Sequence, residues 1–296
     1  MEAREWTAAD AASVLRMPTA ASHKYSRGVV SLRTGSTAYP GAAVLGVEGA
    51  ARGGAGMVRW IGDPDVARLV LQRRPEIVTG EGRTDAWVIG SGMDARARTD
   101  EERATLVNVL RSGAPVVVDA GALDLAAEAR GPVVVTPHDG ELKEVRIPLG
   151  LGVDDVEGDD PLADRLRRGF EERLLVARET AVALGGAVLL KGAATIVAAP
   201  TGWFAVVRAG TPWLATAGTG DVLAGVIGAV AAAVAAAGPL DAEDLAKAAA
   251  TGAWLHGHAA RLAAGAADGA AGHPITALEV AAHLPQAYGA ALSAAS

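Results

Sequence analysis

Six short apolar runs, separated by longer stretches, constrain the fold of this chain more than any other feature of its sequence. The runs lie at residues 28–32, 56–61, 86–89, 116–118, 133–135 and 187–190. Each run is short enough and apolar enough to be a strand that is buried on both faces. Helix-like segments lie between them at about 40–52, 99–111 and 160–184. Strands that alternate with helices predict an α/β fold, in which a mostly parallel central sheet carries helices on both faces.

The remainder of the chain adds a hairpin and a helical end to this plan. Residues 195–199 and 203–207 are predicted to pair around a Pro-Thr-Gly turn. Beyond residue 239 the sequence is expected to be helical. No linker-like or compositional break divides the 296 residues, so a single domain over 1–296 is predicted.

Composition and charge limit the partners of the chain. The formal net charge is −7, whereas a nucleic-acid-binding face needs clustered Lys and Arg, so no nucleic-acid partner is expected. The absence of cysteine excludes disulfides, a thiol nucleophile and a Cys-based zinc site. The uncharged stretch at 223–240 is mostly Ala and Gly, which predicts a buried helix and no membrane partner. The N-terminus does not resemble a signal peptide, and a cytoplasmic location is expected.

Three of the predicted strands end in small or polar residues that suit a ligand site. These ends are Gly90-Ser91-Gly92, Asp119-Ala120-Gly121 and Thr136-Pro137-His138. The carboxyl ends of parallel strands lie at one edge of a sheet, where open α/β folds bind their ligands. We therefore expect these segments to lie near one another.

The segment Ala217-Gly218-Thr219-Gly220-Asp221, directly before a long apolar helix, carries the strongest chemical signal. The glycines let successive backbone N–H groups converge on an anion, and the helix start adds the positive end of its dipole. Since a carboxylate there repels phosphate, Asp221 is predicted to orient a hydroxyl and accept its proton during phosphoryl transfer. The dipole is expected to keep Asp221 ionised near neutral pH. The alternative is that Asp221 only caps its helix, although capping does not need two glycines.

Further segments are compatible with a ligand site and equally with structural roles. Residues 35–42 form either a glycine loop at a ligand or an ordinary strand-to-helix turn. Residues 90–95 match the dinucleotide pattern G-x-G-x-x-G/A, but the acid expected about twenty residues later is poorly placed. A glycine loop that approaches a ligand is therefore favoured there. His138 is either a ligand contact or a surface residue, and Lys191 either binds phosphate or closes a strand.

Taken together, these segments resemble the ADP/ATP-dependent NAD(P)H-hydrate dehydratases, which belong to the ribokinase-like superfamily. The resemblance covers most of the chain and rests on the order and spacing of motifs that are weak individually. The motifs lie at 23–28, 35–42, 52–56, 90–92, 136–141, 191–195, 210–221, 275–277 and 284–285. The resemblance implies a ribokinase-like fold and a homo-oligomer, with a tetramer as the expected form.

The resemblance also implies a repair reaction. Hydrated NADH or NADPH carries a hydroxyl group on its damaged nicotinamide ring. The enzyme would phosphorylate this hydroxyl with ADP or ATP, after which phosphate leaves and the dihydronicotinamide ring is restored. Phosphorylation converts hydroxide, a poor leaving group, into phosphate, a good one, which agrees with phosphoryl transfer at Asp221. Mg²⁺ is expected as the companion ion of the nucleotide, without a dedicated set of protein ligands.

Matching the motifs to the family assigns residues to each ligand. The hydrated dinucleotide would contact Ala42, Gly92, His138 and Asp221. The adenine nucleotide would contact Lys191, Gly192, Ala193, Ala194, Thr195 and Gly220. The backbone N–H groups of Gly218, Thr219 and Gly220 would form the anion hole.

The sequence departs from the usual pattern of this family at five positions. Ser91 and Asp139 stand where proline is common, Thr211 and Ala217 replace an asparagine and a glycine, and Trp213 is bulkier than its usual counterpart. None of these changes removes a residue assigned to the chemistry. Asp139 adds a negative charge near the expected dinucleotide site.

Three other functions are compatible with parts of the sequence. A ribokinase-like kinase for a vitamin or sugar alcohol would share the fold and Asp221, but its phosphorylated product would persist. A nucleotide-binding protein without catalysis would place a repelling carboxylate beside the phosphates, which argues against it. A hydride-transferring oxidoreductase rests on residues 90–95 alone. The sequence does not distinguish ADP from ATP, or NADH hydrate from NADPH hydrate.

Overall fold

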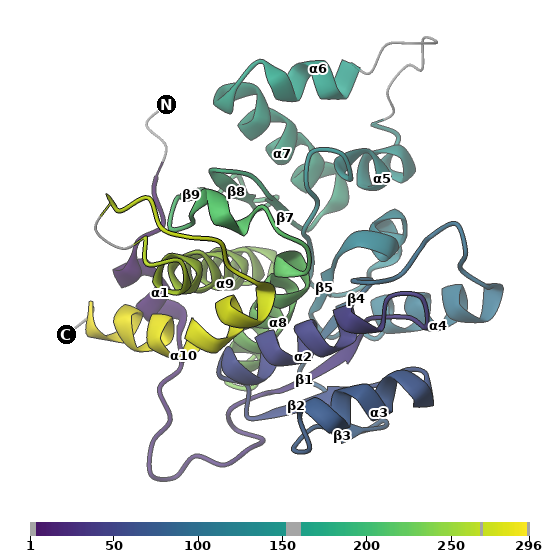
Figure 1. The fold of residues 1–296 in the computed structure, drawn as a ribbon. Helices are drawn as coiled ribbons and strands as arrows, with labels where there is room; N and C mark the ends of the chain where they lie inside the picture. The colour runs from purple at the N-terminus through teal and green to yellow at the C-terminus, as the bar shows by residue number, and fades with distance from the viewer. Residues whose placement is uncertain (1–3, 152–160, 267–268, 295–296) are drawn as a thin grey trace.

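A nine-stranded sheet forms the centre of the computed structural model, which describes residues 4–151, 161–266 and 269–294. The strands lie in the order β3-β2-β1-β4-β5-β6-β7-β8-β9 (Figure 1). They are β1 (Val29–Arg33), β2 (Met57–Trp60), β3 (Val78–Thr79), β4 (Ala86–Ile89), β5 (Val116–Val118), β6 (Val133–Val135), β7 (Ala187–Leu190), β8 (Thr195–Ala198) and β9 (Phe204–Val207). Strands β1 to β7 are parallel, and β8 and β9 extend the sheet as an antiparallel hairpin. The predicted parallel sheet and hairpin are confirmed.

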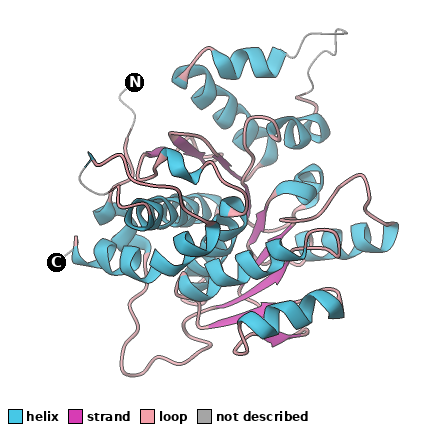
Figure 2. Ribbon diagram, in the orientation of Figure 1, coloured by secondary structure: helices cyan, strands magenta, loops and turns pink. Residues whose placement is uncertain are grey.

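Helices cover both faces of the sheet (Figure 2). One face carries α1 (Ala8–Val14), α2 (Pro40–Arg52), α3 (Pro64–Arg73), α8 (Thr219–Ala235), α9 (Ala242–Ala263) and α10 (Ala277–Ser293). The other face carries α4 (Asp100–Leu110), η1 (Ala120–Glu128), α5 (Leu142–Arg146), η2 (Ile147–Leu149), α6 (Pro161–Arg167) and α7 (Phe170–Leu184). A short 3₁₀ helix, η3 (Pro212–Leu214), precedes α8. The α/β fold with helices on both faces is therefore confirmed.

Alternation along the strands separates two apolar cores. In β5, the side chain of Val117 packs in the core on the α8 side, whereas Val116 and Val118 pack in the core on the α4 side. Both faces of such a strand are buried, which explains why it is a continuous apolar run in the sequence. Helix α8 is buried along most of its length, as predicted for the uncharged stretch. Within the described residues, no helix is both long and apolar enough to cross a membrane.

Three parts of the predicted plan differ from the structure. The helix predicted at 160–184 is two helices, α6 and α7. They are separate because Gly169, which lies between them, has a φ of +115° that no helix residue adopts. Residue 160 itself lies outside the described residues. Beyond residue 239 the chain is not continuously helical, since α9 ends at Ala263 and α10 begins at Ala277. Strand β3 and helix α3 are not among the predicted elements, and β3 has only two residues, both exposed.

Helices α2 and α8 cross with their backbones in direct contact. A Cβ atom on Gly225 of α8 would lie 2.0 Å from the carbonyl oxygen of Gly46 in α2, and one on Gly49 would lie 2.2 Å from the carbonyl oxygen of Val222. No side chain fits at these distances, so glycine is required at the crossing. The contact holds the first two turns of α8, which contain Asp221, against the middle and last turns of α2.

Candidate active site

Two glycine loops meet at the carboxyl ends of β1 and β4. The backbone N–H of Gly35 donates a hydrogen bond of 2.7 Å to the carbonyl oxygen of Ser91. A Cβ atom on Gly92, which has a φ of +67°, would lie 2.3 Å from the Cβ atom of Ala42. Glycine is needed there both for the backbone conformation and for the close approach. The structure thus brings Ala42 and Gly92 together, as expected for two residues that share a ligand.

A charged cluster lies at the carboxyl ends of the next strands. Lys191 Nζ lies 3.0 Å from Asp119 Oδ1 and 3.4 Å from Glu141 Oε2. Asp119 is 3% exposed and also accepts hydrogen bonds from Ser91 Oγ at 2.9 Å and Thr136 Oγ1 at 2.7 Å. Burial alone would lower the pKa of Lys191, but the two carboxylates outweigh it and raise the pKa above its ordinary value. Lys191 is therefore a charged ammonium group whose third N–H can meet a phosphate.

Asp221 lies within the electrostatic reach of this cluster. Burial and then the negative charge of Asp119 raise the pKa of Asp221 to about 6, while Lys191 opposes the shift. The carboxyl group is therefore mostly ionised at pH 7, as expected, but its pKa is well above the ordinary value near 4. Among the described residues no side-chain cap closes the start of α8, so the alternative in which Asp221 acts as a helix cap has no support.

Substituting Asp119 by asparagine should shift the acidic limb of the activity profile to lower pH. The variant removes a negative charge that raises the pKa of Asp221. The Asp221 carboxylate would therefore stay ionised down to a pH that is roughly one unit lower. The measurement is kcat against pH between 4.5 and 8. Asp164→Asn, which removes the same charge from α6, is the control. An unshifted acidic limb in folded Asp119→Asn would mean that Asp221 is not the titrating group.

The loop before α8 has the geometry of an anion site. Gly218, the residue preceding the helix, has a φ of +88°, and a Cβ atom there would lie 2.4 Å from Leu45 Cδ1. The hydroxyl of Thr219 donates to the carbonyl oxygens of Leu214 and Thr216, both at 3.0 Å, which ties the loop back onto η3. Gly220 approaches the cluster, since a Cβ atom on it would lie 3.8 Å from Lys191 Nζ. Thus an anion near Gly220 would also meet the ammonium group.

The predicted nucleotide segment forms the tight turn between β7 and β8. Gly192 and Ala193 are exposed there, while Ala194 and Thr195 are half-buried. Arg173 on α7 holds the start of the turn, because its Nη2 donates to the carbonyl oxygen of Lys191 at 3.2 Å. The backbone of the turn is therefore accessible to a ligand on the side that faces solvent.

The charge of Asp139 is balanced within the protein. The Asp139 carboxylate forms an ion pair with Arg173 Nη1. The extra negative charge that the sequence places near the dinucleotide site is therefore paired, and it does not add an isolated repulsion.

His138 lies at the edge of the charged cluster. Its side chain is 58% exposed, and Nδ1 accepts a hydrogen bond from the backbone N–H of Gly140 at 3.0 Å. Its Nε2 lies 3.5 Å from Glu141 Oε1, and Glu141 in turn contacts Lys191. An exposed imidazole that is oriented by two neighbours can serve as a ligand contact.

The other departures from the family pattern have visible contacts. Ser91 supplies the hydroxyl that donates to Asp119, which a proline could not do. Trp213 Nε1 donates to the carbonyl oxygen of Ala271 at 2.9 Å, joining η3 to the segment before α10. Thr211 caps η3 through its hydroxyl. Nothing in the structure explains Ala217.

Three important neighbours of the site were not assigned a role from the sequence. In the sequence Asp119 is only a strand end and an acid too far along the chain for the dinucleotide pattern, and Glu141 is only part of a motif. His256 of α9 is buried and lies against the backbone of Thr219; burial lowers its pKa to about 4, so it is neutral. Only tertiary contacts, which no local pattern encodes, bring these side chains to Lys191 and Asp221.

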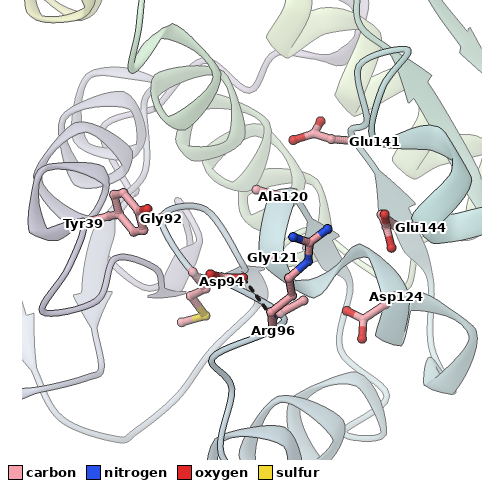
Figure 3. Close-up of a pocket in the computed structure, with 11 residues that line it drawn as sticks. Tyr39, Gly92, Asp94, Arg96, Ala120, Gly121, Asp124, Glu141 and Glu144 are labelled. Atoms are coloured by element: carbon pink, nitrogen blue, oxygen red, sulfur yellow. Dashed lines mark hydrogen bonds between the residues drawn. The ribbon is translucent and has the colours of Figure 1, made fainter.

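Two cavities adjoin each other, and the first of them lies next to the charged cluster. The first has a volume of about 440 Å³ and is lined by Gly92, Ala120 and Glu141, among others (Figure 3). The second has a volume of about 600 Å³ and shares Tyr39, Met93 and Asp94 with the first. Together the cavities extend from the charged cluster to the loop after β1.

Comparison with known proteins identifies the family of this chain. A sequence profile described as NAD(P)H-hydrate dehydratase matches residues 30–280. The chain belongs to the NAD(P)H-hydrate dehydratase family. The resemblance inferred from the motifs is thereby confirmed.

Curated members of the family are similar over most of the chain. The bifunctional NAD(P)H-hydrate repair enzyme of Mycobacterium tuberculosis is 37% identical over 239 residues, covering 76% of this chain and 45% of that enzyme. The ADP-dependent (S)-NAD(P)H-hydrate dehydratase of Neisseria meningitidis is 33% identical over 272 residues, which cover 85% of this chain and 82% of that enzyme. The chain therefore spans less than half the length of the bifunctional enzyme and most of the length of the second.

Solved structures agree with this placement. The ADP/ATP-dependent NAD(P)H-hydrate dehydratase of Bacillus subtilis, co-crystallised with ATP and Mg²⁺, has a TM-score of 0.78 at 29% identity and covers 98% of this chain and 99% of that one. A ribokinase-like superfamily protein of Enterococcus faecalis has a TM-score of 0.73 at 21% identity, and the match covers 96% of this chain and 94% of that protein. The second likeness concerns the fold alone, and it confirms the ribokinase-like architecture.

Proposed function

We propose that this chain dehydrates hydrated NADH or NADPH with ADP or ATP, restoring the dihydronicotinamide. The observation that carries the proposal is the position of Asp221, whose pKa is raised to about 6 beside the ammonium group of Lys191. A buried carboxylate with this pKa is a better proton acceptor than an ordinary one and is still ionised at neutral pH. The membership of the chain in the dehydratase family supports the same activity.

The first step is phosphoryl transfer. Asp221 accepts the proton of the ring hydroxyl while the hydroxyl oxygen forms a bond to the terminal phosphorus of the nucleotide. The bond from that phosphorus to the bridging oxygen breaks, and the shortened nucleotide leaves. Lys191 and the N–H groups of Gly218, Thr219 and Gly220 stabilise the negative charge on the transferred group.

The second step is elimination. The lone pair of the ring nitrogen expels phosphate as the carbon–oxygen bond breaks, and loss of a proton from the neighbouring carbon forms the double bond of the dihydronicotinamide. The protein orients the ring and excludes water from the intermediate. We propose that Ala42, Gly92 and His138 contact the dinucleotide on this side of Asp221, in agreement with the contact between Ala42 and Gly92.

The nucleotide is proposed to bind along the turn after β7. Lys191, Gly192, Ala193, Ala194, Thr195 and Gly220 would contact it. Within the described residues, no group of three or more His, Asp or Glu side chains is placed to hold a metal ion. We therefore propose that Mg²⁺ enters with the nucleotide phosphates and supplies charge neutralisation there.

Recovery of NADH from its hydrate should require the protein, Mg²⁺ and either ADP or ATP. The dihydronicotinamide absorbance and released inorganic phosphate would be followed together, with equal yields expected because each turnover forms one of each. Omission of nucleotide is the control. Turnover without nucleotide would contradict phosphoryl transfer, and a phosphorylated product that persists would favour a small-molecule kinase.

Three further properties stay predictions. The resemblance suggests a homo-oligomer such as a tetramer, which light scattering of the purified protein would measure. A single domain over 1–296 and a cytoplasmic location are likewise proposed from the sequence.

A further inference from the structure

The second cavity lies at the point in the sheet where the order of strand addition along the chain reverses, between β1 and β4. Along the chain the strands first add on one side of β1, through β2 and β3, and then on the other side, through β4. The loops after β1, β2 and β4 all line the cavity, through Gly35, Gly62 and Met93 among others. A crevice between strands whose connections run in opposite directions is the usual ligand site of an open α/β sheet.

One arginine lines this cavity and has no partner in the described part of the chain. Arg33, the last residue of β1, is half-buried; its Nε is out of contact with solvent and makes no hydrogen bond. No ion pair joins it to an acidic side chain among the described residues. Thr34, which is 1% exposed, lines the same cavity, and its hydroxyl also lacks a partner. Desolvated donors without partners are unfavourable, so they indicate a ligand that accepts hydrogen bonds.

Helix starts add positive potential to the same cavity. The residues that precede α2, α3 and α4, namely Tyr39, Asp63 and Thr99, all line it. Helices α3 and α4 have acidic residues in their first turns and side-chain caps, whereas α2 has neither. The uncompensated start of α2 and the guanidinium group of Arg33 therefore favour an anion.

The remaining charges of the cavity are carboxylates, from Asp63, Asp94, Glu101 and Glu102. Two of them are engaged in local turns, because Asp63 accepts from the N–H of Asp65 and Asp94 from the N–H of Arg96. Ribose hydroxyls donate readily to carboxylates, as in other dinucleotide sites. The cavity thus offers one cation to a phosphate group and several carboxylates to sugar hydroxyls, which matches a nucleoside phosphate. Its volume of about 600 Å³ is large enough to hold a nucleoside phosphate.

We propose that the second cavity binds the adenosine half of the dinucleotide substrate, with Arg33 bound to one of its phosphate groups. The proposal rests on the proposed function, because it places the nicotinamide half in the first cavity beside the charged cluster. The cavities share Tyr39, Met93 and Asp94, so one molecule can occupy both. The phosphate is either part of the pyrophosphate, which both substrates contain, or the 2′-phosphate, which only NADPH hydrate contains.

The test compares Arg33→Gln and Arg33→Lys with the wild type on both hydrates. Arg33→Gln should raise KM about tenfold or more, while kcat stays within twofold of the wild-type value. The reason is that the contact of Arg33 with the phosphate is equally strong in the ground state and the transition state. Arg33→Lys should retain most of the affinity. Arg130→Gln, which removes the same charge from an exposed residue before β6, is the control. A KM effect confined to NADPH hydrate assigns the 2′-phosphate, and an equal effect on both hydrates assigns the pyrophosphate.

Calorimetric titration with NAD⁺ and NADP⁺ separates this proposal from the proposed function. If the wild type turns over neither hydrate, the dehydratase proposal fails, while the Kd values of the Arg33 variants for the unreactive dinucleotides still test the cavity. Ala38→Asp, at an exposed position of the same lining, provides a second variant that should raise KM by repelling phosphate, should Arg33→Gln not fold. Unchanged KM and Kd in folded Arg33→Gln, or a wild type that binds neither dinucleotide, would overturn the inference.

Discussion

Asp221→Asn should lower kcat by about 10²-fold or more and at the same time stabilise the folded protein at neutral pH. Asparagine keeps the size of the side chain but cannot accept the proton of the substrate hydroxyl. Affinity for ADP or ATP should hold or increase, because a negative charge beside the phosphates is removed. A loss of turnover without a loss of nucleotide binding is the signature of a group that acts in the chemical step.

The gain in stability follows from the pKa of Asp221. In the folded protein the pKa is about 6, compared with about 4 in the unfolded chain. The folded state therefore favours the protonated form, and ionisation of Asp221 destabilises it progressively between pH 4 and 6 and fully above pH 6. Two units of pKa correspond to roughly 3 kcal/mol, which Asp221→Asn would recover at pH 8 but not at pH 4.

Urea unfolding of the wild type and of Asp221→Asn at pH 8 and pH 4.5 measures this difference. Asp164→Asn on the exposed surface of α6 is the control and should change stability little at either pH. The expectation would be wrong if Asp221→Asn were less stable at pH 8 and retained near-normal kcat. Such a result would mean that the carboxylate is structural.

Lys191→Met should weaken nucleotide binding by about tenfold or more and should also destabilise the fold. The ammonium group is held by Asp119 and Glu141 and approaches Gly220 of the loop before α8. Its removal deletes the positive charge of the proposed phosphate site. It also leaves the buried Asp119 without a counter-charge, which typically destabilises a protein by roughly 3 kcal/mol.

A double variant separates these two effects. Lys191→Met combined with Asp119→Asn removes both charges, so much of the lost stability should return while nucleotide affinity should stay low. Calorimetry with ADP and ATP, together with urea unfolding, gives both quantities. Lys247→Met, which removes a partly exposed charge from α9, is the control. Nucleotide affinity equal to that of the wild type in folded Lys191→Met would place the phosphates elsewhere.

Local patterns in the sequence were sufficient for every strand of the sheet except β3. Runs such as 116–118 are apolar at every position because both faces of β5 are buried, and this makes the strand recognisable. Gly218 and Gly220 mark the predicted anion loop, since Gly218 has a φ of +88° with Leu45 Cδ1 2.4 Å from its Cβ position and Gly220 leaves the space beside Lys191 open. Gly169, by contrast, was not recognised as a helix boundary, since a single glycine inside a helical pattern is also tolerated.

The electrostatics of the site could not be predicted in the same way. The raised pKa of Asp221 depends on Asp119, a residue 102 positions earlier in the chain, and on the burial that the surrounding elements create. The ion pair between Lys191 and Asp119 likewise joins the ends of β7 and β5, which are separated by β6 in the sheet. Such pairings depend on topology and side-chain direction, neither of which a motif specifies.

The glycine crossing of α2 and α8 also limits how the site can move. At this crossing a carbonyl oxygen of each helix lies close to the position that a Cβ atom would take on the other helix. The two helices therefore have no space to slide or rotate independently. Asp221 and the loop after β1 therefore behave as one rigid wall of the site. We therefore expect the displacement that admits a dinucleotide and releases phosphate to occur at the other wall of the first cavity, formed by η1 and the start of α5.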